Sequence, residues 1–288
     1  MKEELRDLSK KNNIDLIGFC NIHDLVIDYD KYKLQEQLNY KCSFQVGNIH
    51  DKDLTSDKYE CYNTAIVIGI KYSGIIMNDE DSVYVSSCSQ DEDYHLIVNK
   101  KLNIIGEYLE RHNYKYKCFV DNNPLDERLL AYNAGLGFYG KNNLLINEEL
   151  GSFFFIGVIL TDAVIEKDKI VNKKCINCNL CIKNCPTKAL NENGILNANR
   201  CLSYLTSKKQ ADILLEENIN NCIYGCDKCI SVCPYNKGNF IEGEKININD
   251  FLNMSEEEFK EKYKNRAFYW RGKKVLDRNI KLYINSKK

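Results

Sequence analysis

Seven cysteines with matched spacings form two runs between Cys175 and Cys233, and Cys201 stands alone between the runs. The first run reads C-x-x-C-x-x-C-x-x-x-C-P, and the second reads C-x-x-C-x-x-x-C-P. In proteins with two four-iron clusters, the fourth cysteine of a run ligates the cluster of the other run. We therefore assign cluster 1 to Cys175, Cys178, Cys181 and Cys233, and cluster 2 to Cys185, Cys201, Cys226 and Cys229. Because such clusters carry single electrons, the spacing predicts electron transfer.

Disulfides and zinc are the alternative uses of these cysteines. The N-terminus, MKEELRDLSKKNNIDLIGF, lacks an apolar segment with a cleavage site, so a secreted disulfide scaffold is disfavoured and a cytoplasmic protein is expected. Zinc sites typically use paired C-x-x-C units or Cys/His mixtures, and the first run has neither pattern. The other cysteines are expected to be buried small hydrophobes, namely Cys20, Cys42, Cys61, Cys88, Cys118 and Cys222. Cys222 precedes Cys226 by four residues and stays open as an alternative to Cys201.

Length and charge give broader limits. The 288 residues exceed what two clusters need, so a substantial second domain is expected. The net charge of −1 gives no overall nucleic-acid signature, but residues 260–288 hold eleven Lys or Arg against Glu261 and Asp277. This basic segment is either a solvated helix surface or a contact for phosphates. No apolar run approaches the roughly 18 residues of a membrane span, so no membrane association is expected.

The first 165 residues alternate between strand-like and helix-like patterns, which predicts helices packed on a sheet. Apolar runs rich in β-branched residues predict strands at 64–70, 83–85 and 116–120. Apolar residues recur at three- and four-residue intervals between 94 and 112, which predicts a helix that covers the sheet. A second helix is expected at about 125–133, ended by Gly135 in the left-handed conformation. Asp121 follows the last strand and lies at its carboxyl end.

Glycines and aromatic residues alternate in the next stretch, with Gly135, Gly137 and Gly140. Glycine allows the backbone to approach a large flat ligand, but it also suits an ordinary tight turn, and the sequence leaves both open. The stretch is not a Walker A loop, because Asn142 follows Gly140–Lys141 where that motif needs Ser or Thr.

Taken together, these segments resemble the epoxyqueuosine reductase family. The resemblance rests on Val120-Asp121-x-x-Pro124-x-x-Glu127-Arg128, Ala134-Gly-Leu-Gly-Phe-x-Gly-Lys-Asn142, Gly151-Ser152 with Thr161-Asp162, Arg200-Cys-Leu-Ser-Tyr-Leu-Thr206, Tyr224-Gly-Cys-Asp-Lys-Cys229 through Asn236, and Arg278-Asn279. It extends over most of the chain.

The resemblance implies an enzyme that reduces epoxyqueuosine to queuosine in the anticodon loop of tRNA. Two [4Fe-4S] clusters would pass electrons from a low-potential donor to cobalamin. Asp121 is implied as the proton donor, and His95 is a second candidate for that proton. The implied cobalamin contacts are Asp121, Arg128, Gly140, Lys141, Asn143, Phe154, Ser203 and Asp227. A monomer that binds the tRNA anticodon arm and no membrane is expected.

The fold class implied is α+β. An α/β-like cobalamin-binding domain with a mixed sheet is expected at 1–165 and a ferredoxin-like two-cluster domain at 166–240. The basic segment at 241–288 is expected to pack on the core.

Two features depart from the family pattern. Of an aromatic-rich Tyr-Ala-x-Gly-x-Asp-Tyr-His segment only Asp93-Tyr94-His95 is present, so the cobalamin contacts of the 88–95 loop stay open. The chain also ends at Lys288, so we expect a short form without the helical-repeat region that helps to hold tRNA. In that form either the core and the basic segment contact the anticodon arm, or the substrate is smaller than a tRNA.

Two other functions are compatible with the same residues. One is a reductive dehalogenase-like enzyme, which would couple cobalamin and two clusters to a small organohalide. The other is a ferredoxin-like electron carrier without catalysis, in which the first 165 residues form a docking domain and no corrinoid is bound.

Overall fold

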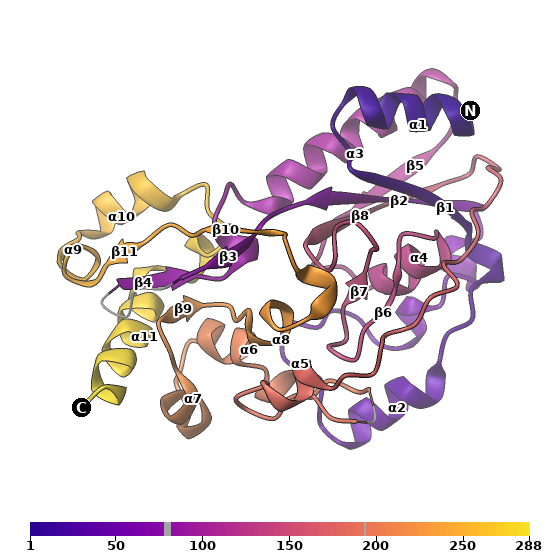
Figure 1. Cartoon of the computed structure of the whole chain (residues 1–288). Coiled ribbons are helices and arrows are strands. Elements are labelled where there is room, and N and C mark those ends of the chain that lie inside the picture. The colour runs from indigo at the N-terminus through magenta and orange to yellow at the C-terminus, as the bar shows by residue number, and fades with distance from the viewer. Residues whose placement is uncertain (78–81, 193) are drawn as a thin grey trace. The chain divides into compact units, whose positions relative to one another are not determined.

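The computed structural model of the chain describes residues 1–77, 82–192 and 194–288 (Figure 1). It divides into two compact units, each assembled from separate stretches of sequence. Unit 1 comprises Met1–Leu38, Ser43–Lys71 and His95–Asn177, and unit 2 comprises Asn39–Cys42, Tyr72–Tyr94 and Cys178–Lys288. The three-part division expected from the sequence ran in chain order, whereas these two units interleave.

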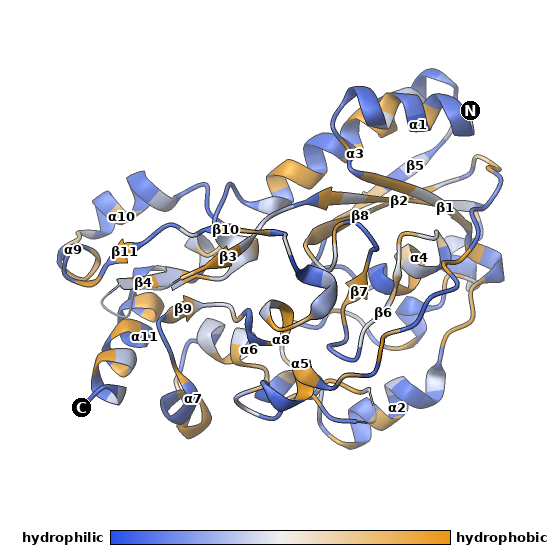
Figure 2. Cartoon of the chain, viewed as in Figure 1, coloured by the Kyte–Doolittle hydropathy of each residue, from blue (hydrophilic) through white to orange (hydrophobic). Residues whose placement is uncertain are grey.

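Unit 1 is built on a four-stranded sheet with the order β1-β2-β8-β5. Its strands are β1 (Leu16–Asn21), β2 (Thr64–Lys71), β5 (Tyr116–Phe119) and β8 (Phe154–Thr161). The three ladders are antiparallel, and the longest pairs β2 with β8 over the full length of both strands. Figure 2 shows β2 as hydrophobic over most of its length, as expected of a central strand covered on both faces.

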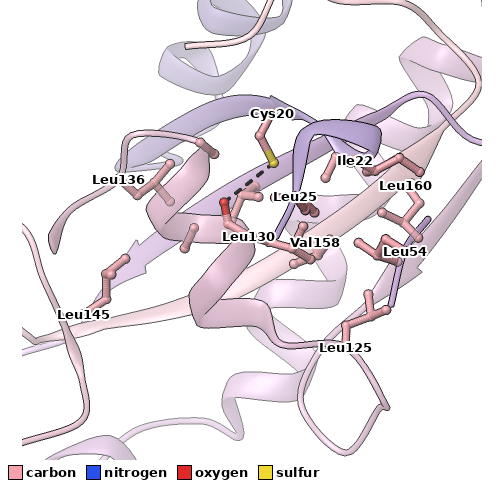
Figure 3. Packing of buried hydrophobic residues seen from close by; sticks show 14 of the residues in the cluster. Cys20, Ile22, Leu25, Leu54, Leu125, Leu130, Leu136, Leu145, Val158 and Leu160 are labelled. Atoms are coloured by element: carbon pink, nitrogen blue, oxygen red, sulfur yellow. Dashed lines mark hydrogen bonds between the residues drawn. The ribbon is translucent and has the colours of Figure 1, made fainter. Parts of the chain in front are cut away.

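Side chains that alternate along β2 enter two different cores, because successive residues of a strand point to opposite faces. Ala65 and Val67 pack with α4 (Glu127–Asn133), while Ile66 and Ile68 pack with α1 (Lys2–Lys11) and α3 (Tyr94–Arg111). Figure 3 shows the α4 core, in which the Cys20 thiol donates a hydrogen bond to the Leu130 carbonyl at 3.7 Å. The sheet is therefore covered by helices on both sides.

The rest of unit 1 surrounds this sandwich. Its elements are α2 (Tyr29–Gln37), the hairpin of β6 (Phe138–Tyr139) and β7 (Leu145–Ile146), and the 3₁₀ helices η1 (Ile22–Asp24), η2 (His50–Lys52) and η3 (Asp57–Tyr59).

Unit 2 contains two small sheets. One has the order β11-β4-β9 and the other the order β10-β3. The strands are β3 (Gly74–Ile76), β4 (Ser82–Val85), β9 (Cys222–Tyr224), β10 (Phe240–Glu242) and β11 (Ile246–Asn247). In the first sheet β11 runs antiparallel to β4 while β9 runs parallel to it, so this sheet is mixed.

Helices form most of the core of unit 2. They are α5 (Leu180–Lys183), α6 (Leu202–Ser207), α7 (Ile213–Asn218), α8 (Lys228–Ser231), α9 (Ile248–Asn253), α10 (Glu256–Tyr263) and α11 (Lys273–Ser286), with η4 (Ser87–Ser89), η5 (Ala198–Arg200), η6 (Pro234–Asn236) and η7 (Tyr269–Arg271). Leu276, Ile280 and Tyr283 of α11 are buried in its main hydrophobic cluster. Between them, the Asn279 amide donates to the carbonyls of Thr206 at 2.9 Å and Ile223 at 2.8 Å. This buried amide fastens α11 to α6 and β9.

The α+β class expected from the sequence is confirmed, and the expected strands and helices form as β2, β4, β5, α3 and α4. The sheet of unit 1, expected to be mixed, is antiparallel instead. After β2 the chain passes through residues of unit 2 before it returns to unit 1 in α3. No helix of the described residues is long and apolar enough to cross a membrane.

Candidate iron-sulfur and acid site

Four thiols of unit 2 lie close enough to influence one another's ionisation, and they are Cys185, Cys201, Cys226 and Cys229. Burial is the main cause that raises the pKa of Cys226, to about 12, and nearby thiols raise it further. Burial and the same neighbours raise the pKa of Cys229 well above its usual value. Buried thiolates of this kind need a positive partner, which cluster iron supplies. The structure thus brings together the four cysteines assigned to cluster 2.

Backbone N–H groups are directed at three of these sulfurs. The Ala189 amide donates to Cys185 Sγ at 3.2 Å. The amides of Ser203 and Tyr204 bond to Cys201, and the amide of Lys228 bonds to Cys226. The bonds to Cys201 and Cys226 arise because α6 and α8 begin just after these two cysteines. The first N–H groups of a helix have no partner within the helix and can bond to sulfur. Hydrogen bonds to sulfur help to set cluster potentials, so this surrounding fits a [4Fe-4S] cluster.

Cys222 lies in a different environment from these four thiols. It is 2% exposed, and its thiol donates to the Tyr224 carbonyl at 3.4 Å. The groups that affect its ionisation are Asp227, Cys226 and Cys88, after burial itself. Cys201, by contrast, acts on both Cys226 and Cys229. The geometry therefore favours Cys201 as the fourth ligand of cluster 2.

The cysteines assigned to cluster 1 occupy a loop and the start of a short helix. Asn177 and Asn179 alternate with them and have φ values of 61° and 59°. Asn tolerates this left-handed conformation better than most residues, so the chain can curl between successive thiols. Cys181 packs beside the small core around Cys185, and Cys233 precedes η6. Within the described residues no three His, Cys, Asp or Glu converge on a single-ion site, and a four-iron cluster holds its ligands further apart.

Asp121 follows β5 in a short loop of unusual backbone conformation. Asp121 and Asn122 have φ values of 40° and 41°, in a region that non-glycine residues rarely adopt. The Asp121 side chain is 58% exposed, and its Oδ2 lies 3.7 Å from His95 Nε2. The two proton-donor candidates named from the sequence therefore lie side by side.

Glu127, which the sequence identified only as part of a motif, contacts the same loop. Its Oε1 accepts hydrogen bonds from the Asp121 N–H at 2.9 Å and from Asn123 Nδ2 at 2.7 Å. Burial raises the pKa of Glu127 to about 7, and the nearby Asp121 charge adds to this, although both hydrogen bonds act in the opposite direction. A buried carboxyl gives no sequence signal of its own, because its burial depends on tertiary packing.

Arg128 links α4 to the β6–β7 hairpin. Its Nη1 donates to the Asn143 carbonyl at 2.6 Å, and its charge helps to keep the pKa of Asp126 low although burial acts to raise it. Gly140, Lys141 and Asn143 form the hairpin turn, in which Asn143 has a φ of 63°. Three of the implied cobalamin contacts therefore lie on one turn, and a fourth, Arg128, donates a hydrogen bond to that turn. Phe154, at the start of β8, is 7% exposed within the α4 core.

The glycines of this hairpin are required by the protein's own packing. A Cβ on Gly137 would lie 2.3 Å from the Ile146 carbonyl oxygen, and one on Gly135 would lie 2.5 Å from that of Lys169. Gly135 also has a φ of 76°, the left-handed end of α4 that the sequence predicted. Contacts within the protein thus explain Gly135 and Gly137, and the ligand role named for these glycines from the sequence stays a prediction.

Asn142 in the same turn presents a buried donor. The residue is 5% exposed, its Oδ1 accepts from the Leu144 N–H at 3.2 Å, and its Nδ2 has no partner among the described residues. An orphaned buried amide is costly unless a ligand or water satisfies it. This donor therefore fits a cofactor with acceptor groups at its edge, as a corrin with amide side chains has.

Ser203 and Asp227, the remaining implied contacts, belong to unit 2. The Asp227 carboxylate accepts from both the N–H and the hydroxyl of Ser87, at 2.7 and 2.8 Å, and burial raises its pKa despite these bonds. It lines a cavity of about 290 Å³ with Tyr84 and Phe240. Residues near the altered 88–95 loop thus lie beside the cluster 2 helix α8.

Comparisons with known proteins agree with these features. Residues 174–236 match the family described as "4Fe-4S double cluster binding domain", and residues 58–122 match "Epoxyqueuosine reductase QueG, DUF1730". The epoxyqueuosine reductase of Lactococcus garvieae is 36% identical over 302 residues, which cover 97% of this chain and 85% of that protein. The chain belongs to the epoxyqueuosine reductase family.

Solved structures of epoxyqueuosine reductases share the fold. The Streptococcus thermophilus enzyme has a TM-score of 0.91 at 31% identity, over 99% of this chain and 80% of that one. A structure of an epoxyqueuosine reductase with an epoxyqueuosine-modified tRNA-Tyr stem loop has the same TM-score and identity, over 98% of this chain and 80% of that one. A reductive dehalogenase with a bound bromohydroxybenzoic acid is only 15% identical, with a TM-score of 0.54, and shares the fold alone.

Replacing Cys201 by Ser is expected to remove cluster 2 and leave cluster 1 largely intact, because Cys201 is the thiol close to Cys226 and Cys229. Iron analysis of the reconstituted protein should then show a loss of about half the iron. Cys222→Ser is the matched control and should keep both clusters. Loss of a cluster in the Cys222 variant alone would reverse the assignment.

Glu127 is expected to lower the stability of unit 1 as pH rises from about 4.5 to about 7. Its pKa of about 7 in the folded protein exceeds the ordinary value of 4.5, so the folded state binds the proton more tightly than the unfolded chain. The resulting stabilisation is complete below the ordinary pKa and is lost as pH rises through about 7. Urea unfolding at about pH 5 and pH 8 should show a larger advantage over Glu127→Gln at the lower pH. Equal differences at both values would mean that burial does not retain this proton.

Proposed function

We propose that this protein reduces epoxyqueuosine to queuosine in the anticodon loop of a tRNA. The single observation that carries the proposal is the convergence of four cysteines, three of which have backbone N–H donors on their sulfurs. The chain that holds them covers about four fifths of the solved epoxyqueuosine reductases. The tRNA stem loop bound in a relative's structure supports the choice of substrate.

Cobalamin is the proposed partner of the clusters. Deoxygenation of an epoxide to an alkene takes two electrons and two protons and releases the oxygen as water, whereas each cluster passes one electron at a time. When bound, cobalamin supplies a cobalt centre that can deliver both electrons to carbon. In unit 1, the residues proposed to contact it are Asn142 with its unsatisfied Nδ2, Arg128 and the β6–β7 turn. Ser203 and Asp227 stay predicted contacts on the family resemblance alone.

Asp121 is the proposed proton donor to the departing oxygen. It lies near the start of the loop after β5, which the protein holds in a rare backbone conformation. Its exposed carboxyl is accessible to a macromolecular substrate. His95, whose Nε2 lies 3.7 Å from Asp121 Oδ2, is the proposed alternative donor. General acid catalysis of this kind needs the donor within hydrogen-bond reach of the substrate oxygen.

The surface for tRNA is proposed to lie on the exposed lysines of the C-terminal segment. Lys273 is 5% exposed and paired with Asp277 at 2.8 Å, and Arg278 donates to the carbonyls of Lys208 and Lys209. These two cations hold the fold and are unsuited to phosphates. Lys260, Lys262 and Lys264 are exposed along and after α10. Of the nearby aromatics, Phe268 is buried in the core while Trp270 is 57% exposed.

The proposal also includes a low-potential electron donor, a monomeric protein and a cytoplasmic location. A low-potential donor is required by the clusters, and a tRNA substrate is consistent with the cytoplasm.

A turnover assay with epoxyqueuosine-containing tRNA, cobalamin and a low-potential reductant tests the proposal, and Asp121→Asn sharpens it. The amide keeps the side-chain shape but cannot donate the proton as an acid, so turnover should fall by about a hundred- to ten-thousand-fold while iron content and cobalamin absorbance stay unchanged. Near-normal turnover in this variant would assign the acid to another residue. Wild-type protein that binds no corrinoid would instead indicate an electron carrier, and turnover of organohalide without tRNA binding would indicate a dehalogenase.

Neutralising Lys260, Lys262 and Lys264 together is expected to weaken tRNA binding and flatten its dependence on salt. Each lost phosphate contact removes the release of about one counterion. Binding of tRNA at several salt concentrations measures the slope. A triple replacement of Lys10, Lys11 and Lys33, which are exposed on unit 1, is the charge-matched control. Equal slopes for both triple variants would show that the C-terminal lysines have no special role.

A further inference from the structure

The loop that carries Asp121 needs support from outside its own backbone. Two successive non-glycine residues, Asp121 and Asn122, have positive φ values, and such conformations persist only where surrounding contacts enforce them. The loop backbone is exposed at both residues, so apolar packing does not provide this support. Its hydrogen bonds therefore decide where the Asp121 carboxyl points.

The Asp121 carboxyl accepts one of these hydrogen bonds within the loop, from the Asn122 N–H to Oδ1 at 2.7 Å. The hydrogen bonds of the Asp121 backbone involve Glu127 and Asn123. Glu127 Oε1 accepts from the Asp121 N–H at 2.9 Å and from Asn123 Nδ2 at 2.7 Å. Asn123 Nδ2 also donates to the Asp121 carbonyl at 3.0 Å. Both backbone groups of Asp121 are thus tied, one directly and one through Asn123, to a single carboxylate oxygen.

Glu127 is not required to start its own helix. The N-cap of α4 is Asp126, whose Oδ1 accepts from the Leu129 N–H at 3.0 Å and whose other oxygen accepts from the Tyr32 hydroxyl. Glu127 is therefore available for the loop, and its partly buried position costs stability when it ionises. The charges that act on it are those of Asp121, which raises its pKa, and Arg128, which lowers it, after burial as the largest cause.

We propose that Glu127 is the positioning residue of the acid loop, and that its Oε1 holds the Asp121 backbone so that the carboxyl is presented to the substrate. This inference rests on the proposed role of Asp121 as proton donor. Glu127 itself does not touch the substrate and transfers no proton to it. Its contribution is the geometry of the neighbouring acid, on which proton transfer depends steeply.

Two replacements of Glu127 separate the acceptor from the charge. Glu127→Gln keeps an Oε1 that can accept both hydrogen bonds, so kcat should stay within about threefold of wild type. Glu127→Ala removes the acceptor, and kcat should fall by about ten- to a hundredfold with the KM for tRNA unchanged, because only the acid is misplaced. Glu256→Ala is the matched control, since Glu256 is likewise the first residue of a helix behind a capped N-terminus.

Hydrogen exchange at the Asp121 amide gives a readout independent of turnover and of bound cofactor. Exchange should be faster in Glu127→Ala than in wild type, and unchanged in Glu127→Gln and Glu256→Ala. If the alanine variant does not fold, Glu127→Met fills the same volume without an acceptor and takes its place.

The possible outcomes are distinct. If Glu127→Gln loses as much activity as Glu127→Ala, the charge or proton of Glu127 matters and positioning by Oε1 is wrong. If Glu127→Ala is fully active while Asp121→Asn is not, the positioning role fails and the acid assignment stands. If Asp121→Asn is fully active, the acid assignment itself fails. Unchanged amide exchange in Glu127→Ala would also overturn the inference.

Discussion

Bringing four thiols together in a poorly hydrated site is the constraint on which unit 2 depends. Burial raises the pKa of Cys201, Cys226 and Cys229, and neighbouring thiols raise it further, so ionising these three groups is costly without iron. The N–H groups at the starts of α6 and α8 partly offset that cost for Cys201 and Cys226. Cluster iron supplies the remaining positive charge that buried thiolates need. Two very short helices are thereby explained, because their value lies in the unsatisfied donors of their first turns.

Around this centre the fold uses rigid, ordinary packing. Asn279 connects α11 to α6 through the Thr206 carbonyl, and Arg278 fixes the same region through the carbonyls of Lys208 and Lys209. The Arg-Asn pair of the sequence thus holds α11 against α6 and the residues that follow it, with Asn279 buried and Arg278 half-buried. A basic residue near the end of a chain suggests a surface, and only its hydrogen bonds reveal an internal role.

The sequence predicted where strands and helices form better than it predicted which strands pair with one another. The apolar run of β2 and the periodicity of α3 reflect burial on a sheet, which is a local property of the pattern. The strand at 83–85 was also found, but its pairing with β9 and β11 was not, because that contact joins residues more than a hundred positions apart. For cluster 2, the four cysteines assigned from the sequence lie close together, whereas the assignment of cluster 1 stays a prediction. Glu127 could not be identified in the same way, because an interior carboxyl and an exposed one look alike in sequence.

Around the β6–β7 turn, the glycine pattern that suggested ligand binding coincides with close approaches within the protein itself. These glycines suggested close approach to a flat ligand, yet their missing side chains make room for the Ile146 and Lys169 carbonyls. The better indicator is Asn142, whose Oδ1 closes the turn while its buried Nδ2 lacks a partner in the described chain. A glycine reports only that space is needed, whereas an unsatisfied donor specifies what must fill it. An acceptor at this turn would satisfy the amide and bring the cofactor next to Arg128, on the helix whose first residue holds the acid loop.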